Sequence, residues 1–380
     1  MTRLVSVLAG LTASVAVALT PLHAEEYQAD GLTVSTETIV EGLASPWALA
    51  FLPDGALLVT ERGGTMRIIA DGKKSAPIAG VPKVFARGQG GLLDVALAPD
   101  FPQSDLIYFT YSQPGDGGAG TAVARARLRR EGNGGRLEDV KTIFSMNRKT
   151  SRGQHFGSRI VVAPDGKLFV TIGERGERDR AQDFSDHAGS VIRINADGTI
   201  PSDNPFVGTT GALPELWSKG HRNAQGAAWD PVTQSLWITE HGARGGDEVN
   251  RPEAGKNYGW PVITYGRDYS GAEIGTGTAA EGYEQPLHYW DPSIAPSGLA
   301  VYRGDMFPEW QGDLLAGALK YEMLVRLERD ADGQITGEER LLKGAYGRIR
   351  DVRVAADGSV FLLTDDENGK IIRMSRHADE

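Results

Sequence analysis

A glycine-rich segment in the middle of the chain places several oxygen-bearing side chains close together. An apolar run at residues 236–239 is followed by Glu240, His241, Asp247 and Glu248, with three glycines between them. Carbonyl groups left free by glycine, together with carboxylates, suit a hard cation such as Ca²⁺. Acidic glycine turns are also common at protein surfaces, so a solvated loop between two strands is the alternative.

Cationic side chains occur in three further segments. These segments contain Arg222 with Asn223, then Lys320, then Arg348 with Arg350. Arg348 and Arg350 would point to the same side of a strand, because side chains alternate along it. If the segments converge, they form a cationic pocket for a ligand with several carboxylates, which arginine binds through paired hydrogen bonds. Taken singly, each arginine is more often a partner in a surface ion pair.

His155 is the strongest candidate for a general base. It lies between glycines in GQHFG, just before a strand-like run at 159–162. A neutral imidazole can accept a proton near neutral pH. A hydrogen-bonded structural histidine is the alternative, and the other histidines that compete for the role are His187, His221, His241 and His288.

The overall composition excludes several classes of protein. The chain has 380 residues, 40% of them hydrophobic, and a formal net charge of −10. An acidic protein lacks the basic surface that nucleic acids require, so no nucleic-acid partner is expected. The sequence contains no cysteine, which excludes disulfides, thiolate metal sites and a cysteine nucleophile.

The first 24 residues have the pattern of a secretory signal peptide. Arg3 precedes an apolar stretch at 4–19, and the small residue Ala24 precedes two glutamates. The apolar stretch is short for a membrane span of ~20 residues, so cleavage is favoured over an uncleaved anchor. We expect an exported protein that does not span the membrane after cleavage, and that is a monomer or a dimer.

One sequence pattern, a turn followed by an apolar strand, occurs six times and indicates the elements that would position these side chains. A turn containing Pro, Asp, Gln or Gly is followed each time by an apolar strand. The six strand phrases are ALLVTE, DLIYFTYS, KLFVTIGE, SLWITEHG, DLLAGAL and SVFLLTDD, and TMRII, VIRI and IIRM look like partner strands. Such a unit, repeated at irregular intervals of roughly 45 to 80 residues, is typical of propeller blades with insertions. We therefore expect an all-β propeller formed by residues 25–380 as a single domain, with 263–283 as a long loop over one face.

The common nucleotide-binding and hydrolase motifs are either absent or lie outside their usual structural context. GDGGAG at 115–120 matches G-x-G-x-x-G, but it lies between two strand-like runs and no helix follows, so we expect a hairpin loop. The chain has no G-x-x-x-x-G-K-[ST], no H-E-x-x-H and no G-x-S-x-G. The readings as an NAD or ATP enzyme, a zinc protease or an α/β-hydrolase therefore lose their main support.

Five longer motifs carry a family resemblance. In chain order they are GHRNAQG, EHGARGGDEVN, GKNYGWP, SIAPSG and GRIRD. Through these motifs the chain resembles the soluble PQQ-dependent aldose (glucose) dehydrogenases over nearly its whole length after the leader, and it looks closest to their broad-specificity aldose branch. The resemblance implies a six-bladed β-propeller in the periplasm that binds pyrroloquinoline quinone (PQQ) and Ca²⁺.

The family's roles carry over to matching positions. The resemblance makes His155 the general base and puts Arg222 beside the reactive quinone carbonyl. The cofactor contacts it implies are Gln89, Arg222, Asn223, Lys320, Arg348 and Arg350. The calcium ligands it implies are the backbone carbonyls of Gly242 and Ala243 at one site, and Glu248, Tyr258 and Asp268 at a second, structural site. Gln154 and Trp290 would lie at the substrate cleft.

Two positions depart from the family's pattern. Gln154 stands where glucose-specific members have Asp, which separates this chain from them at the residue before the base. Ala243 stands where the first calcium turn has Pro. The backbone carbonyl is kept in that turn, but the turn is less rigid without the proline ring.

The implied reaction is the oxidation of an aldose at C1 to a lactone. His155 takes the proton of the C1 hydroxyl, hydride passes to the quinone, calcium polarises the quinone carbonyl, and electrons pass on to an external acceptor, a quinone or a cytochrome. Two alternatives stay open. A calcium-dependent propeller hydrolase of lactonase type would need a metal held by carboxylates at the channel. A non-enzymatic periplasmic binding propeller would not bind PQQ tightly.

Overall fold

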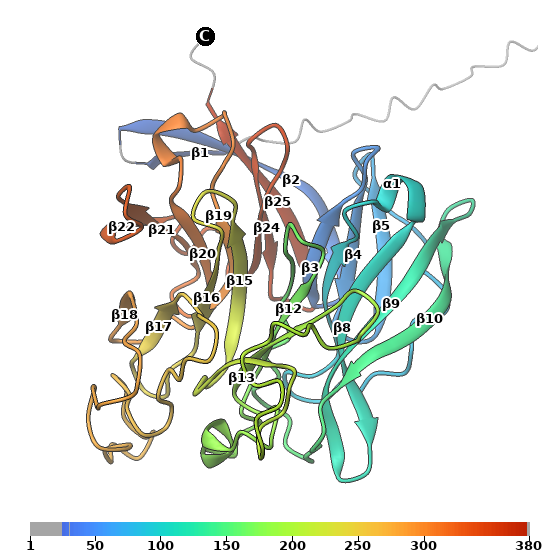
Figure 1. Cartoon of the computed structure of the whole chain (residues 1–380). Helices are drawn as coiled ribbons and strands as arrows, with labels where there is room; N and C mark the ends of the chain where they lie inside the picture. The colour runs from blue at the N-terminus through green and yellow to red at the C-terminus, as the bar shows by residue number, and fades with distance from the viewer. Residues whose placement is uncertain (1–24, 30, 378–380) are drawn as a thin grey trace, which may run out of the picture.

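The computed structural model describes residues 25–29 and 31–377, and the expected signal peptide at 1–24 lies outside them. Six antiparallel sheets are arranged around a common centre (Figure 1). The inner strands of neighbouring sheets contact one another in sequence, from β3 through β7, β11, β15, β19 and β23 and back to β3. This closed ring of six blades confirms the expected all-β, six-bladed β-propeller.

Each of the first three sheets follows its predecessor along the chain. The first contains β3 (Pro46–Phe51), β4 (Leu57–Glu61), β5 (Thr65–Ala70) and β6 (Lys73–Lys74). The second contains β7 (Leu92–Leu97), β8 (Leu106–Gly115), β9 (Gly118–Arg130) and β10 (Gly135–Ser145), with the short helix α1 (Phe101–Ser104) between its first two strands. The third contains β11 (Ile160–Val162), β12 (Leu168–Ile172), β13 (Ser190–Ile194) and β14 (Leu216–Lys219), with the 3₁₀ helix η1 (Arg178–Gln182) between β12 and β13.

The last sheet is built from both ends of the chain. The fourth sheet contains β15 (Ala224–Asp230), β16 (Ser235–Glu240), β17 (Asp247–Asn250) and β18 (His288–Trp290). The fifth contains β19 (Pro296–Val301), β20 (Leu314–Ala318), β21 (Met323–Arg329) and β22 (Ile335–Leu341), with η2 (Pro308–Trp310). The sixth joins β23 (Ile349–Val354), β24 (Val360–Thr364) and β25 (Gly369–Arg376) to the N-terminal β2 (Leu32–Leu43) and β1 (Glu25–Ala29). Pairing of β2 with β25 closes the ring.

The repeated sequence phrases correspond to one position in every blade. The six apolar phrases form β4, β8, β12, β16, β20 and β24, the second strand of each sheet, and the three partner runs form the third strands β5, β13 and β25. The expected hairpin at 115–120 is also confirmed, because β8 and β9 stay paired up to Gly115 opposite Gly118. Residues 263–283 contain no strand, as expected of a loop.

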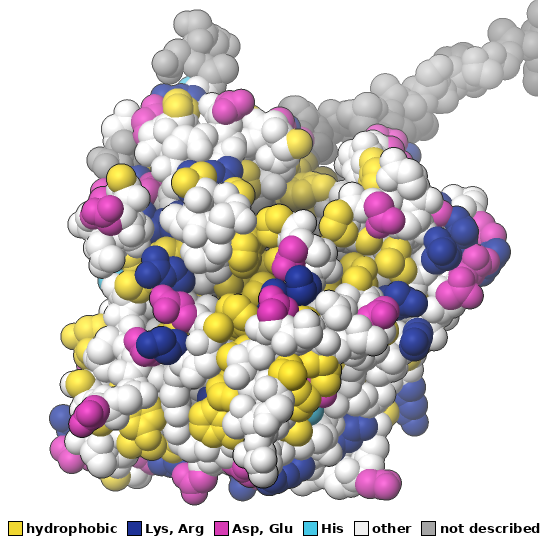
Figure 2. Space-filling view, in the orientation of Figure 1, with side chains coloured by type: hydrophobic (Ala, Val, Ile, Leu, Met, Phe, Trp, Pro, Cys, Tyr) yellow, Lys and Arg dark blue, Asp and Glu magenta, His cyan; other side chains and the backbone are white. Residues whose placement is uncertain are grey.

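The two ends of the central channel differ in character. At one end, all six inner strands line a cavity of about 380 Å³ with mainly hydrophobic side chains. Figure 2 shows hydrophobic side chains gathered in the hollow between β3, β15 and β19. The residues expected to do chemistry belong to the other end, because they precede an inner strand or follow a second strand, and these points meet at one edge of an antiparallel sheet.

Four charged side chains close the channel between these ends. Arg159 lies 2.8 Å from Asp351 and 3.4 Å from Asp94. Arg353 binds the same two carboxylates at 2.8 and 2.6 Å. The Arg159 guanidinium also lies 4.1 Å from the centre of the Trp47 ring. Asp94 belongs to β7, Asp351 and Arg353 belong to β23, and Arg159 immediately precedes β11. With Trp47 from β3, the contacts tie four blades at the axis.

Removing one carboxylate of this network should destabilise the whole ring. Asp351→Ala leaves two arginines short of a partner near the axis, for which a loss of about 3–5 kcal/mol in the free energy of unfolding is expected. Urea unfolding measures this loss in the free energy of unfolding. The control Glu41→Ala removes an exposed carboxylate 3.6 Å from Lys370 and should change stability by less than about 1 kcal/mol. Equal effects of the two substitutions would contradict the role of the axial network.

Candidate active site

Two adjoining cavities contain several of the residues predicted from the sequence. A cavity of about 170 Å³ is lined by His155, Arg222 and Asp268, and one of about 520 Å³ by Lys320 and the turn at 241–245. They share two lining residues, Ala243 and Tyr269. Two larger cavities, of about 710 and 700 Å³, lie between blades and contain none of the predicted site residues. Convergence of charged groups, rather than size, therefore marks the candidate site.

His155 is held in one orientation. It lies in the segment between β10 and β11, with a left-handed backbone at φ 55°. Its backbone N–H donates to Gln89 Oε1 at 2.7 Å, and its ring Nδ1 faces the buried carboxylate of Glu174. This partner favours the tautomer with hydrogen on Nδ1, which leaves the Nε2 lone pair free. Burial lowers the pKa of His155; Glu174 offsets part of this effect, and Arg222 adds to it. A neutral imidazole with a free Nε2 can act as a general base.

Glu174 was missed by the sequence analysis. It stands two residues after β12, at the sheet edge where β11 begins, so its place in KLFVTIGE could have indicated it. Burial is the largest single influence and would raise the pKa of Glu174, but the hydrogen bond and charge of His155, together with the charge of Arg222, keep this pKa below its usual value. Its Oε2 is buried and has no hydrogen-bond partner. The only side-chain hydrogen bond of the Glu174 carboxylate in the described residues is thus the one with the His155 ring.

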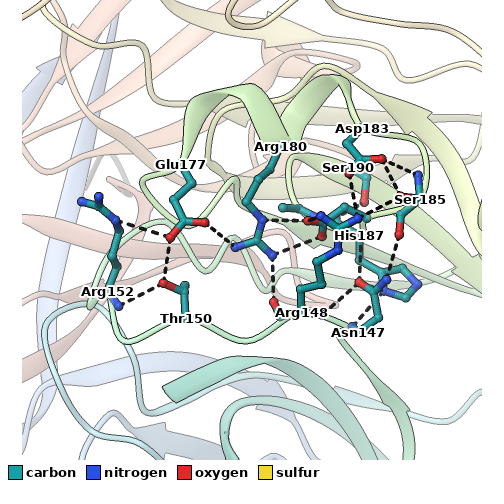
Figure 3. A network of polar contacts seen from close by, with 12 residues as sticks. Asn147, Arg148, Thr150, Arg152, Glu177, Arg180, Asp183, Ser185, His187 and Ser190 are labelled. Atoms are coloured by element: carbon teal, nitrogen blue, oxygen red, sulfur yellow. Dashed lines mark hydrogen bonds and ion pairs between the residues drawn. The ribbon is translucent and has the colours of Figure 1, made fainter. Parts of the chain in front are cut away.

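A network of polar contacts supports the segment that leads to His155 (Figure 3). Glu177 accepts a hydrogen bond from Thr150 at 3.1 Å and lies 3.6 Å from Arg152. Arg180, from η1, binds Glu177 at 3.3 Å and donates to the carbonyl of Arg148 at 2.8 Å. These contacts tie residues 148–152 to the loop that follows Glu174.

Arg222 and Asn223 stand just before β15, and of the two only Arg222 lines the cavity of His155. Arg222 is 7% exposed, and its Nε has no hydrogen-bond partner. Its Nη1 donates to the carbonyl of His241 at 3.3 Å, and its guanidinium lies 5.2 Å from the centre of the Trp260 ring. In the described part of the chain it forms no ion pair. Asn223 accepts from the Gly157 amide at 3.1 Å, while its Nδ2 lacks a partner. Arg222 Nε and Asn223 Nδ2 are therefore two buried donors without a hydrogen-bond acceptor.

Lys320 and the two later arginines are placed differently. Lys320 lines the larger cavity. Arg348 and Arg350 point to the same side, as expected, because both bind Asp365 at 2.9 Å. Although burial alone would raise it, the two arginines lower the pKa of Asp365 to about 2. Arg350 also donates to Gln225 at 2.7 Å. Neither arginine lines the two cavities, and Asp365, a partner that the sequence analysis missed, holds both.

The turn after β16 forms a cradle of backbone oxygens. A side chain at Gly242 would meet the carbonyl oxygens of Gly245 and Gly246 at 2.3 Å, so only glycine fits there. Asp247 closes the turn by accepting from the Gly242 amide at 2.8 Å and from the Ala295 amide at 2.7 Å. Converging carbonyls beside a carboxylate fit a hard cation such as Ca²⁺.

Glu248 and Tyr258 belong to a second group of polar side chains. Asn250 donates to Glu248 at 3.0 Å and to Glu240 at 2.9 Å. Burial, and then repulsion from Glu240, raise the pKa of Glu248 to about 8. Glu240 binds His221 at 2.8 Å, and the His221 ring stacks on Tyr258 with centroids 4.8 Å apart. Two crowded carboxylates, the buried Glu240 and the half-buried Glu248, fit a cation, which would relieve their repulsion.

Three further predicted residues are placed as follows. Asp268 lines the cavity of His155 and forms an ion pair with Arg178 at 2.9 Å, so it does not join the group around Glu248. Trp290 is 3% exposed, packs in the hydrophobic core and donates to Glu338 at 2.9 Å, and it lines neither cavity. Gln154 lines the smaller cavity beside His155. Within residues 25–29 and 31–377 no group of three or more His, Asp or Glu side chains could hold a metal by itself.

The fold is a six-bladed propeller, and at this end of its channel His155 lies in one cavity with the buried Arg222. The sequence profile described as "Glucose / Sorbosone dehydrogenase" matches residues 43–373. The chain therefore belongs to the glucose/sorbosone dehydrogenase family of propeller oxidoreductases.

Individual relatives agree with this family. The chain is 47% identical to the aldose sugar dehydrogenase YliI of Escherichia coli, over 90% of this chain and 93% of that protein. The crystal structure of the soluble aldose sugar dehydrogenase of Escherichia coli in its apo form has a TM-score of 0.87 at 46% identity, covering 90% of this chain and 100% of that one. The PQQ-bound aldose sugar dehydrogenase of Streptomyces coelicolor has a TM-score of 0.75 at 29% identity, covering 90% and 98%.

The contacts of His155 predict how its ring titrates. NMR of the histidine ring should show its pKa below the ordinary 6.5, because burial and Arg222 disfavour the charged form. In Glu174→Gln the pKa should fall further, since the carboxylate that favours protonation is gone. A His155→Gln variant assigns the signal. Titration of the unaltered protein at or above 6.5, or a rise in Glu174→Gln, would show that the electrostatic balance is different.

Proposed function

We propose that this protein oxidises aldose sugars at C1 to lactones with PQQ and Ca²⁺. The observation that carries the proposal is a histidine whose Nδ1 faces Glu174, in one cavity with a buried arginine that has no ion-pair partner in the described residues. Relatives named as aldose sugar dehydrogenases, one of them in a PQQ-bound form, support this substrate and cofactor. No observation favours the hydrolase or the binding module over this function.

The residues of this chain have separate tasks in the reaction. His155 Nε2 takes the proton of the C1 hydroxyl, and Glu174 stabilises the imidazolium that results. Arg222 stabilises negative charge that develops on an oxygen in the cavity. Gln154, on the cavity wall, contacts the sugar. When bound, PQQ supplies the hydride acceptor and Ca²⁺ the Lewis acid that polarises it.

The donors around the cavities fit an anionic cofactor. The cavity of about 520 Å³ that Lys320 lines is within the usual size of a small-molecule site. We propose that Lys320 binds a cofactor carboxylate together with Arg348 and Arg350, which then share their donors between the cofactor and Asp365. Asn223 Nδ2 is a free donor, and Gln89 adds a contact from the start of β7.

We propose two cation sites. The cofactor's Ca²⁺ lies on the backbone carbonyls of Gly242 and Ala243, in the turn where carbonyls converge. A structural Ca²⁺ lies on Glu248 with Tyr258. Asp268 is not part of this second proposal, because its carboxylate pairs with Arg178.

We also propose that the protein works outside the cytoplasm. Residues 1–24 direct export to the periplasm, leaving 25–380 as one propeller domain. No helix in the described residues is long and apolar enough to cross a bilayer. Turnover would need an external electron acceptor, a quinone or a cytochrome, to reoxidise the cofactor.

The function is tested by reconstitution. The apo-protein with PQQ, Ca²⁺ and a panel of aldoses should reduce a redox dye, and His155→Gln should lower kcat by about 10²- to 10⁴-fold while PQQ still binds. Lys320→Ala should weaken PQQ binding by about tenfold to a hundredfold, because a charge-assisted hydrogen bond is lost. Absorbance titration measures this binding, with the exposed Lys343→Ala as control. Tight PQQ binding without activity on any aldose would overturn the proposed reaction.

The structural Ca²⁺ is tested by thermal unfolding in EDTA and in Ca²⁺. Because the pKa of Glu248 is about 8, this side chain is mostly neutral at pH 7 without a cation, so Glu248→Gln should change stability little in EDTA. Ca²⁺ at a hundred times its Kd should stabilise the unaltered protein by about 2.7 kcal/mol, and Glu248→Gln should lose most of this gain. The exposed control Glu253→Gln should keep it. A full gain in Glu248→Gln would remove Glu248 from the site.

A further inference from the structure

Arg175 combines three costly features next to the candidate base. Its side chain is 0% exposed, and its backbone is left-handed at φ 64°, a region that side chains other than glycine rarely adopt. It forms no ion pair within the described residues, and its Nε is buried without a hydrogen-bond partner. A buried guanidinium without a paired carboxylate opposes folding unless other contacts hold it. Such an outlier invites a functional explanation.

The side-chain hydrogen bonds and the ring contact of Arg175 fall on the segment that carries His155. Its Nη1 donates to the carbonyl of Gln154, and its Nη2 donates to the carbonyl of Arg152 at 2.8 Å. The guanidinium lies 3.4 Å from the centre of the Phe156 ring. One planar side chain thus holds the backbone before His155 and the ring that follows it.

The segment around His155 is held by individual side-chain and backbone contacts rather than by strand pairing. No strand covers residues 146–159, and His155 itself has φ 55°. Gln89 holds the opposite side, with its N–H donating to Gly153 at 2.7 Å and its Oε1 accepting from His155. Gln89 and Arg175 therefore hold the segment between them.

We propose that Arg175 is a positioning residue for His155. Its guanidinium fixes the backbone at 152–154 and the Phe156 ring, so that the imidazole keeps Nδ1 on Glu174 and Nε2 free to take a proton. Because Glu174 and Arg175 are consecutive, one turn after β12 supplies both the partner of the ring and the support of its backbone. The task needs the planar fork of arginine, which lysine cannot reproduce. This inference rests on the proposed role of His155 as base.

The test compares Arg175→Lys with Arg148→Lys. Both substitutions keep the charge, but Arg148 is 51% exposed and pairs with Asp183 in the network of Figure 3, without contacting residues 152–156. For the reconstituted enzyme we expect kcat with a saturating aldose to fall about tenfold to a hundredfold in Arg175→Lys, with KM changing less than threefold, because a displaced base slows the chemical step. Arg148→Lys should keep the original kcat.

Two further measurements use the apo-protein and need no cofactor. Ring-nitrogen NMR of His155 should report the Nδ1–H tautomer in the unaltered protein and a mixture of tautomers in Arg175→Lys. Amide hydrogen exchange at residues 153–157 should quicken in that variant while core strands keep their protection. A purely structural role for Arg175 would instead lower protection in the core strands and leave the tautomer unchanged.

The outcomes separate this inference from the proposed function. An inactive unaltered enzyme with PQQ bound overturns the proposed function, while the apo-protein measurements still decide the role of Arg175. An active enzyme with the original kcat and tautomer in Arg175→Lys overturns the positioning role. If Arg175→Lys does not fold, hydrogen exchange in the unaltered protein decides, because rapid exchange of the His155 amide would show that the segment is not fixed.

Discussion

The axial network of two arginines and two aspartates is the constraint on which the site depends. Arg159 pairs with carboxylates from two blades, and it also donates to the backbone carbonyls of Gln225 at 2.6 Å and Arg350 at 3.0 Å. Those carbonyls belong to the segments that carry Asn223 and the later arginines. Arg159, one of the charges that close the channel, thus also fixes the backbone beside the candidate site residues. Partly satisfied networks of this kind are costly, so such a network favours one arrangement of the blades.

The meeting of distant residues follows from the repeated blade. In an antiparallel sheet, the start of the first strand and the end of the second lie at the same edge. In the sequence, each recurrent turn precedes the second strand of a blade. The turns therefore mark the sheet edge opposite to the one where that strand ends. His155 precedes β11, Arg222 precedes β15, and Lys320 follows β20, so the sequence predicts one common end for all three. This much was predictable because the strand period and the turn residues are local properties of the chain.

The pairings within that end were not predictable. Glu174 and Asp365 each follow a second strand by one or two residues, as other carboxylates do, and no local pattern shows which cation they face. Asp268 lies in a loop without strands, where the backbone path decides that Arg178 is its partner. Trp290 is drawn into the core because β18 pairs with β17, with Trp290 opposite Asp247. These outcomes depend on contacts between blades, which spacing along the chain does not encode.

Burial, and after it the charge of Arg222, lower the pKa of His155 in an otherwise acidic protein. With burial again as the larger cause, the charge of Arg222 also helps bring the pKa of His241 to about 3. A carboxylate paired with Arg222 would neutralise this field and let the pKa of both rings rise. The buried donor left without a partner costs about 1–3 kcal/mol of folding free energy. That cost accompanies a buried cation without an ion pair in the described residues, whose charge lowers the pKa of the imidazole and would attract an anion that enters the cavity.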